Sequence, residues 1–344
     1  MKELLMMPEI TAPRSWTVPE KHYISVLESP WYRNLTQLQD IIAHRTTDFW
    51  TRRGARFLHL PITTGSISSP MGRGSDSSPV QVNLEGVPTY LADSMQFMLE
   101  FGCRLTPDGA YYLMPSFRGE PADETHLCQF FHSEAEIIGG LDDVIQAVED
   151  YLRHLASGLL EYGRDALISV AGSVEHVEAL ASSGPLPRIT FEQAVEQLGE
   201  DPALVKSLEP QCRSLTRAGE RALMDLYGGY VWVTHPDHLS VPFYQAFDEK
   251  DESKALAADL LFGIGETVGA GERHANGGDL ARALELHDVE AEAYEWYSTM
   301  KYRHPQRTAG FGLGVERFLL WATKHDDIRD LALLLRFNGT NILP

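Results

Sequence analysis

GFGLGVERFLLW, residues 310–321, is the stretch that decides the fold of this 344-residue chain. Glycine alternates with apolar residues over its first five positions, which indicates a strand whose backbone another group can approach closely. The apolar residues then follow a helical spacing, so the predicted strand runs directly into a helix over 315–324. Arg317 lies in the first turn of that helix. The stretch alone fits two structures: a floor beneath a ligand, and a strand–helix junction with a buried Glu316–Arg317 pair.

The sequence contains neither of the common glycine-rich phosphate loops. No segment fits GxxxxGK[ST], and none fits GxGxxG, because Val315 stands where GFGLGV would need its last glycine. A bound nucleotide would therefore have to be held by side chains. Arginine is the best suited, since its planar guanidinium matches two phosphate oxygens at once.

A second segment, FRGE at residues 117–120, supplies another arginine. It ends a predicted strand and leads into a polar loop that returns at His126 and Phe130. Arg118 could bind phosphate, although Arg118 and Glu120 could equally form an exposed ion pair worth well under ~1 kcal/mol. This segment by itself does not separate the two interpretations.

A third segment carries two carboxylates, Asp259 and Glu266, on either side of the glycine-containing residues 260–265. Such a pair could coordinate Mg²⁺ on a polyphosphate, because Mg²⁺ takes few protein carboxylates and keeps phosphate oxygens as its other ligands. The two residues could equally be solvated acids in turns.

The remaining pattern predicts a mostly antiparallel sheet flanked by helices, because strands occur at irregular spacing with helices inserted between them. Residues 170–228 are predicted to form a helical insertion, and the glycine- and serine-rich stretch 63–78 is either a mobile surface loop or a lid over a substrate. We predict helices over 35–51, 141–162, 289–300 and 315–324, and strands over 56–62, 80–85, 111–118, 130–136, 230–234, 255–261, 266–269 and 309–314.

Composition narrows the class of protein. The chain has 29 basic and 49 acidic residues, a net charge of −20, which counts against a protein that wraps nucleic acid. Its three cysteines are widely spaced, and Cys128 with His132 is too small a set for a zinc site. No signal-peptide pattern occupies residues 1–21, and no apolar run reaches the ~18–20 residues of a membrane span. These features predict a cytoplasmic enzyme without a membrane partner.

Together the three segments resemble, in order and spacing, the signature motifs of class II aminoacyl-tRNA synthetases of the aspartyl/asparaginyl branch. FRGEPADETHLCQFFHSEAE at 117–136 is similar to the second motif, and GFGLGVERFLLW to the third. ETVGAGERH at 266–274 is similar to the stretch that binds metal and reads the substrate side chain. The resemblance covers residues 20–344 and implies an α+β class II catalytic domain. It also implies a homodimer, with the first motif at 35–62 at its interface.

The resemblance further implies an ATP and Mg²⁺ site with named residues. Arg118 would hold the α-phosphate and Arg317 the γ-phosphate, both acting in catalysis. The implied nucleotide-binding set is Arg118, Glu120, His126, Phe130, Glu266 and Arg317, with Phe130 stacking on adenine and His126 near the β/γ end. Asp259 and Glu266 would carry Mg²⁺. Ser94, Gln96 and Arg273 would bind the amino acid, Arg273 through its side chain.

Several positions depart from the family pattern, mainly where the amino acid would bind. Asp93 and Met95 replace Gln and Pro of Gln-Ser-Pro-Gln, and RTAG at 307–310 replaces Pro-His-Gly-Gly. Gln129 stands where the family usually has Glu, and the loop at 65–78 is longer and more serine-rich. These departures leave amino-acid activation in place and make the identity of the amino acid uncertain.

The sequence therefore predicts an adenylate-forming ligase. It would activate an aspartate-like or asparagine-like amino acid as an acyl-adenylate and pass it to ammonia or a small amine, releasing AMP and pyrophosphate. It would thus be similar to stand-alone asparagine synthetase-related paralogues. The charge and the lack of an anticodon-binding barrel predict that no tRNA is bound. Two alternatives stay open: transfer to a tRNA, a carrier protein or a protein lysine, and a non-catalytic regulator that binds amino acid or nucleotide.

Overall fold

In the part of the chain that the structure describes, an eight-stranded sheet forms the centre of the molecule, in the order β1-β5-β6-β15-β14-β13-β10-β7. The computed structural model describes residues 10–69, 77–199, 201–209 and 212–343. The two outer strands, β1 and β7, pair in parallel with their neighbours, and the inner strands pair antiparallel. In sheet order the strands are Arg56–Phe57, Ala110–Phe117, Gln129–Ile138, Thr308–Gly314, Gly265–Glu272, Ala257–Phe262, Val231–Thr234 and Arg188–Thr190.

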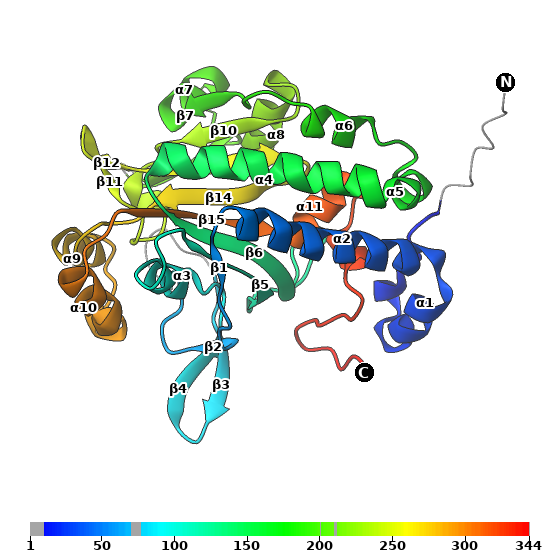
Figure 1. Cartoon of the computed structure of the whole chain (residues 1–344), viewed down its shortest axis with the longest axis horizontal. Coiled ribbons are helices and arrows are strands. Elements are labelled where there is room, and N and C mark those ends of the chain that lie inside the picture. The colour runs from blue at the N-terminus through cyan, green and yellow to red at the C-terminus, as the bar shows by residue number, and fades with distance from the viewer. Residues whose placement is uncertain (1–9, 70–76, 200, 210–211, 344) are drawn as a thin grey trace.

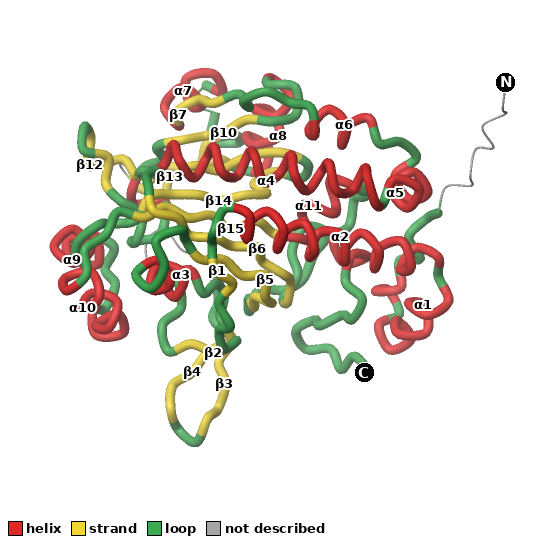
Figure 2. Tube along the Cα trace, viewed as in Figure 1, coloured by secondary structure: helices red, strands yellow, loops and turns green. Residues whose placement is uncertain are grey.

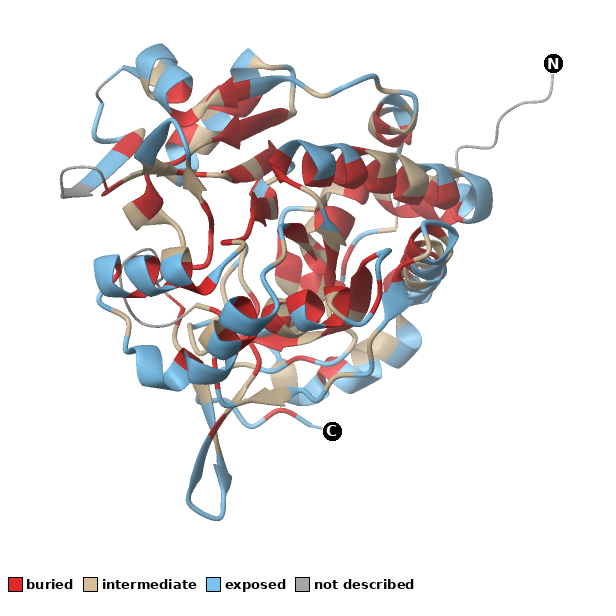
Figure 3. Ribbon diagram, turned by 60° about the vertical axis from the view of Figure 1, so that its left-hand side comes forward, coloured by how far each residue is buried: buried red, intermediate tan, exposed pale blue. Residues whose placement is uncertain are grey.

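Two long helices cover one face of the sheet. α2 (Pro30–Arg52) and α4 (Leu141–Tyr162) run side by side across it, as Figure 1 shows. α2 begins where Ser29 accepts a hydrogen bond from the backbone of Trp31 and where a proline occupies the first turn. α4 begins after Gly140, whose backbone N–H donates to the side chain of Asp143 at 2.8 Å. Their buried faces join the sheet in one apolar core, and Figure 3 shows the exposed residues outside it.

The opposite face of the sheet carries shorter helices and leaves room for a site. α3 (Gln96–Cys103) packs on Tyr112 and Met114 of β5, whereas Tyr111 of the same strand points into the core beneath α2 and α4. The other helices are α1 (His22–Glu28), α5 (Arg164–Ala171), α6 (Glu175–Ala181), α7 (Phe191–Leu198), α8 (Arg217–Leu226), α9 (Gly277–Leu286), α10 (Glu295–Arg303) and α11 (Val315–Ala322).

Within the described ranges, three smaller sheets surround this core, and Figure 2 shows the hairpin of β3 and β4 projecting from it. That hairpin pairs β3 (Val80–Leu84) with β4 (Val87–Leu91), and β2 (Thr63–Thr64) extends it. Its two-residue turn places Glu85 and Gly86 at φ 52° and 85°, the left-handed region that a tight hairpin turn requires. The other two sheets pair β8 (Val205–Glu209) with β9 (Cys212–Leu215), and β11 (Phe247–Asp248) with β12 (Asp251–Ala255).

The predicted fold class is confirmed, but several predicted elements differ. The strand predicted over 56–62 shortens to Arg56–Phe57, and Pro61, which has no N–H to donate to a ladder, lies beyond it. The stretch 170–228 is not wholly helical, because β7 joins the main sheet and β8 pairs with β9. The helix predicted over 289–300 begins later, with a 3-10 turn before α10. Residues 70–76 of the predicted loop or lid lie outside the described residues.

Among the described residues, no helix combines the length and the apolar character needed to cross a membrane.

Candidate active site

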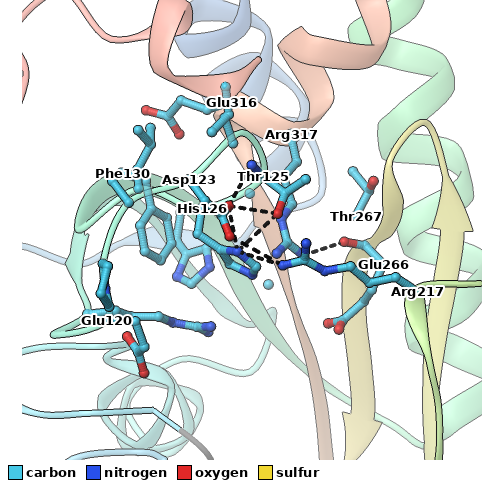
Figure 4. A pocket seen from close by; sticks show the side chains of 18 residues that line it. Glu120, Asp123, Thr125, His126, Phe130, Arg217, Glu266, Thr267, Glu316 and Arg317 are labelled. Atoms are coloured by element: carbon cyan, nitrogen blue, oxygen red, sulfur yellow. Dashed lines mark hydrogen bonds and ion pairs between the residues drawn. The ribbon is translucent and has the colours of Figure 1, made fainter. Parts of the chain in front are cut away.

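A cavity of about 630 Å³ opens on the face of the sheet opposite α2 and α4, where β5, β6, β14, β15 and α11 meet. The three segments singled out in the sequence all contribute to it. Figure 4 shows the side chains of Arg317, His126, Glu266 and Arg217 converging there. Its lining residues include Arg118, Glu120, Asp123, His126, Phe130, His132, Arg217, Glu266, Gly312, Gly314, Glu316 and Arg317.

Alternate residues of β6 form a row along the floor of the site. Phe130, His132, Glu134 and Glu136 share one face, because successive side chains of a strand point to opposite sides. Ser133, on the other face, hydrogen-bonds α4 across the covered side of the sheet. The row extends from the cavity at Phe130 to the buried Glu136 beneath α3.

The glycines of the next strand, β15, make room for this row. Gly310 pairs with Glu136, and Gly312 pairs with Glu134. A Cβ on Gly310 would lie 1.8 Å from Oε2 of Glu136, and one on Gly312 would lie 3.0 Å from Oε1 of Glu134. The alternating glycines of GFGLG are therefore needed because glutamate carboxylates lie across them. The floor expected beneath a ligand is built partly of these carboxylates.

Arg317 does not pair with Glu316, so the simple junction allowed by the sequence is wrong. The carboxylate of Glu316 is buried and accepts hydrogen bonds from the backbone N–H of Phe131 at 3.0 and 3.2 Å. Arg317 instead lines the cavity, and its Nη1 donates to the backbone carbonyl of Glu266 at 2.5 Å. Burial lowers the pKa of Arg317, and Arg118 acts in the same direction. Two neighbouring guanidinium groups thus create positive charge suited to an anion.

Arg118 and Glu120 also do not form the exposed ion pair that the sequence allowed. The guanidinium of Arg118 lies 5.6 Å from the ring centre of Phe130, while Oε1 of Glu120 accepts from the backbone N–H of Ser78 at 2.5 Å. Nε of Arg118 and Oε2 of Glu120 are buried without a hydrogen-bond partner among the described residues. Unsatisfied buried polar atoms are costly, so both are positions at which a ligand would be bound.

The loop after Arg118 meets an arginine that the sequence did not predict. Nδ1 of His126 contacts Oδ1 of Asp123 at 3.0 Å and Nη2 of Arg217 at 3.1 Å. Arg217 comes from the first turn of α8, and it adds a third cation to the cavity. Burial, together with Arg317, lowers the pKa of His126 despite Asp123. The loop is therefore held next to the arginines by polar contacts that an anion could rearrange.

Asp259 on β13 and Glu266 on β14 converge across Gly269. A Cβ on Gly269 would lie 3.1 Å from Oε1 of Glu266 and 3.7 Å from Oδ1 of Asp259. Burial first, then Glu266 and Glu220, raises the pKa of Asp259 well above its usual value. Asp259 is half-buried and Glu266 is exposed at the cavity, and two adjacent carboxylates of this kind fit a divalent cation. Among the described residues, no group of three or more His, Cys, Asp or Glu side chains is placed to hold a metal.

The other end of the row is buried and contains Ser94. Oγ of Ser94 donates to Oε2 of Glu134 at 2.7 Å, and the hydroxyl of Tyr112 donates to the same oxygen. Burial raises the pKa of Glu134 to about 7, against those two hydrogen bonds. Gln96 begins α3, and its side chain contacts the hydroxyl of Tyr244. Ser94 and Gln96 thus lie on the same side of the sheet as Glu134.

Arg273 is buried at this end and contacts other side chains of the protein. Its Nε and Nη2 donate to the carboxylate of Glu136 at 3.2–3.3 Å, and its Nη1 donates to Oε1 of Gln245 at 2.9 Å. Its guanidinium lies 5.3 Å from the ring centre of Tyr244. Burial opposes the charge of Arg273, but Glu136 raises its pKa overall. The arginine is thus fixed before any substrate arrives.

Two of the departures from the family pattern make internal bonds. Asp93 is buried and accepts from the backbone N–H groups of Ser68 and Ser69 at 3.0 and 2.7 Å, which ties the described part of the 65–78 loop to the mouth of the site. Arg307 pairs with Glu272, with Nε–Oε1 and Nη2–Oε2 distances of 2.6 and 2.8 Å.

Sequence reasoning missed Glu134, Glu136, Gln245 and Arg217. The two glutamates carry a signal, because they continue the two-residue period that begins at Phe130. Gln245 and Arg217 carry no such signal, since each reaches the site through packing of distant segments.

Known proteins resemble this chain over most of its length. Residues 17–337 match the family described as tRNA synthetases class II (D, K and N). The chain is 26% identical over 326 residues to an asparagine–tRNA ligase of Koribacter versatilis, covering 91% of this chain and 72% of that protein. It is 28% identical over 316 residues to one of Sorangium cellulosum, covering 88% and 69%.

Solved structures agree on the fold. Asparaginyl-tRNA synthetase from Pyrococcus horikoshii, complexed with asparaginyl-adenylate, superposes with a TM-score of 0.86 at 22% identity, covering 95% of this chain and 73% of that one. Aspartyl-tRNA synthetase from Entamoeba histolytica gives a TM-score of 0.76 at 16% identity, covering 96% and 63%. With its signature residues gathered around one cavity and nearly its whole length matched, the chain belongs to the class II tRNA synthetases of the D, K and N group.

Proposed function

We propose that this chain uses ATP to activate asparagine, aspartate or a close analogue as an acyl-adenylate. The family implies ATP-dependent activation of an amino acid. The observation that supports it most directly is the cavity that joins Arg118, Arg317 and Phe130 to His132, from which the β6 row continues to Glu134 and Glu136. The first three residues suit a nucleotide, and the row leads from them to a polar end that suits an amino acid.

At the nucleotide end, Arg118 would bind the α-phosphate and Arg317 the γ-phosphate, with adenine between Phe130 and Arg317. Charge develops on the phosphorus oxygens during displacement of pyrophosphate, and fixed guanidinium groups stabilise it without reorganising. Glu120 and His126 would hold the base and the β/γ end. Asp259 and Glu266 would carry Mg²⁺, which supplies charge neutralisation to the phosphates when bound.

At the amino-acid end, Ser94, Gln96 and Glu134 would hold the α-ammonium group, because a carboxylate with hydroxyl neighbours suits a cation. Arg273 would face the side-chain oxygen of the substrate. Since Glu136 already neutralises Arg273, an amide oxygen is bound without leaving an extra negative charge in the interior. This supports asparagine-like substrates first.

For the acceptor, we propose the terminal ribose of a tRNA, as the names of the relatives suggest. The comparisons support this alternative better than the small acceptor that the sequence favoured. One observation keeps ammonia or a small amine as the second candidate: the net charge of −20, since tRNA binding relies on Lys and Arg contacts to phosphate. We further propose one cytoplasmic catalytic domain with an insertion over 170–228, paired as a homodimer through α2 and the segment at 56–62.

The test is amino-acid-dependent exchange of labelled pyrophosphate into ATP, with asparagine, aspartate and the other amino acids compared. Exchange with asparagine or aspartate is expected, and exchange with neither would contradict the proposal. Charging of total tRNA and release of amide from ammonium are then measured with the active amino acid. Product in one assay identifies the acceptor. Omission of Mg²⁺ should abolish exchange if Asp259 and Glu266 carry the ion.

A further inference from the structure

We infer that His132 is the general base of the transfer step, where it takes the proton from the acceptor group that attacks the acyl-adenylate. The inference rests on the proposed function, because it assigns a residue to the step that follows activation. It comes from the position of the ring on β6 and from the contacts of its two nitrogen atoms.

His132 lies between Phe130, at the nucleotide end of the β6 row, and Glu134, which contacts Ser94 at the amino-acid end. A strand rises ~3.4 Å per residue, so the Cα of His132 is about 7 Å from the Cα of each neighbour in the row. The bond that joins an amino acid to its adenylate lies between the two ends of the ligand. His132 is therefore the residue of the row nearest to the carbonyl that reacts.

Nδ1 of His132 lies 2.9 Å from Oγ of Ser116 on β5 and 3.2 Å from Oε1 of Glu134. The ring of Phe130 meets the imidazole edge-on, at an interplanar angle of 87° with centroids 4.8 Å apart. These contacts fix the ring. Among the described residues Nε2 has no hydrogen-bond partner, and the residue lines the cavity. An imidazole held by a carboxylate on one nitrogen and open on the other is arranged as a base.

The ring is also neutral. Burial, then Arg118 at the end of β5 and Arg317 on α11, lowers the pKa of His132 to about 3. Once pyrophosphate has left, the α-phosphate of the adenylate, bound to Arg118, would offset part of the positive charge of that arginine and raise the pKa of the ring. A bound nucleotide thus makes His132 more basic at the stage at which the acceptor attacks. Glu134, on the same strand, contacts the other ring nitrogen, with its Oε1 3.2 Å from Nδ1.

The chemistry balances without a further reagent. The nitrogen or oxygen of the acceptor forms a bond to the acyl carbon, and Nε2 of His132 takes the proton that this atom loses. The carbon–oxygen bond to the phosphate then breaks, and AMP leaves with the electron pair. The products are the amide or ester, AMP and one proton on His132, which passes to solvent.

The experiment separates transfer from activation. Adenylate is formed on the protein from labelled amino acid and ATP, isolated by rapid gel filtration, and mixed with the acceptor that the wild-type protein uses. Removal of a general base typically costs about 10²–10⁴-fold. We expect His132→Gln to slow transfer at least about 100-fold while pyrophosphate exchange falls less than about tenfold. In His132→Ala, added imidazole should restore part of the transfer rate.

Each result has a defined meaning. Transfer by His132→Gln within threefold of wild type would overturn the inference, and so would an equal loss in both steps, which would make the ring a binding residue. Absence of imidazole rescue in a folded His132→Ala protein would also count against it. His304→Gln, an exposed histidine at the end of α10, is the matched control and should behave as wild type. If the wild-type protein forms no adenylate, the proposed function fails instead.

Discussion

The two ends of the site differ in how far their polar groups are already satisfied. At the nucleotide end, Nε of Arg118 and Oε2 of Glu120 are buried without a partner among the described residues. At the amino-acid end, Arg273 already donates to Glu136 and Gln245. Binding at the nucleotide end would therefore satisfy groups that folding leaves unpaired. At the amino-acid end, a rigid internal pair exists first, and the substrate must fit against it.

Arg273→Met should have the largest effect, because it leaves the carboxylate of Glu136 buried without its partner. Loss of one member of a buried pair costs about 3–5 kcal/mol of unfolding free energy. Urea denaturation measures this, and pyrophosphate exchange across the amino acids should show lost selectivity with ATP binding retained. Adding Glu136→Gln should restore part of the stability. A single variant as stable as wild type would mean that the pair is not needed to keep this end folded.

Arg118→Ala should have nearly as large an effect, but on activity rather than on stability. Loss of one preorganised donor to developing charge costs about 10²–10³-fold in rate. We expect pyrophosphate exchange to fall by that factor while stability changes little, since the guanidinium has an unsatisfied nitrogen in the free protein. Arg303→Ala, at an exposed arginine at the end of α10, is the control. An equal loss in the control variant would remove the contrast between the two ends.

Acid should destabilise the amino-acid end through its buried histidines. Nε2 of His238 lies 2.9 Å from the backbone carbonyl of Gln245, the residue that holds Arg273, and burial lowers the pKa of His238 to about 4. Below about pH 6.5 the unfolded chain binds the proton and the folded protein does not, so stability falls as the pH falls toward 4, by up to about 3 kcal/mol. His238→Gln should flatten the pH dependence of the urea midpoint. His304→Gln, at an exposed histidine at the end of α10, should leave it unchanged.

Gly310→Ala tests the space above the row of carboxylates. Its Cβ would meet Oε2 of Glu136 at 1.8 Å, so a shift of the carboxylate or of the strand is required. Overpacking of this kind costs about 1–3 kcal/mol. Gly184→Ala, where nothing lies within 4 Å, should change the urea midpoint little. Equal stability of the two variants would show that Glu136 can move aside.

The nucleotide end of the site could be predicted from the sequence more fully than the amino-acid end. The bounds of α4 follow its apolar stripe and coincide with the prediction of 141–162. Arg118 and Arg317 belong to short motifs, so their proximity follows from the motifs. Gln245 reaches Arg273 only after β14 and the loop before β11 fold together, and no local pattern encodes such a contact.

The elements that were missed are short and depend on their neighbours. β7 has three residues, one of them buried, and its strand character comes from pairing with β10 rather than from an alternating pattern. The strand predicted over 56–62 ends at Phe57, and Pro61 beyond it has no N–H to donate to a ladder. Insertion residues such as Arg217 enter the site for the same reason: the packing of α8 against β13 and β14 brings them there.

Of these substitutions, Arg217→Ala should have the smallest effect, and it tests how far the nucleotide end of the site extends. Its Nη2 lies 3.1 Å from Nδ1 of His126 in a cavity that already holds Arg118 and Arg317, and it is half exposed. A water-exposed cation contributes less to phosphate binding than a buried one. We therefore expect the KM for ATP in pyrophosphate exchange to rise about tenfold, worth ~1.4 kcal/mol, with kcat changed less. Arg221→Ala, one turn further along α8, should leave KM unchanged, and Arg217→Lys should recover part of the loss. If Arg217→Ala instead raises the KM for the amino acid, the nucleotide end would extend less far than the cavity does.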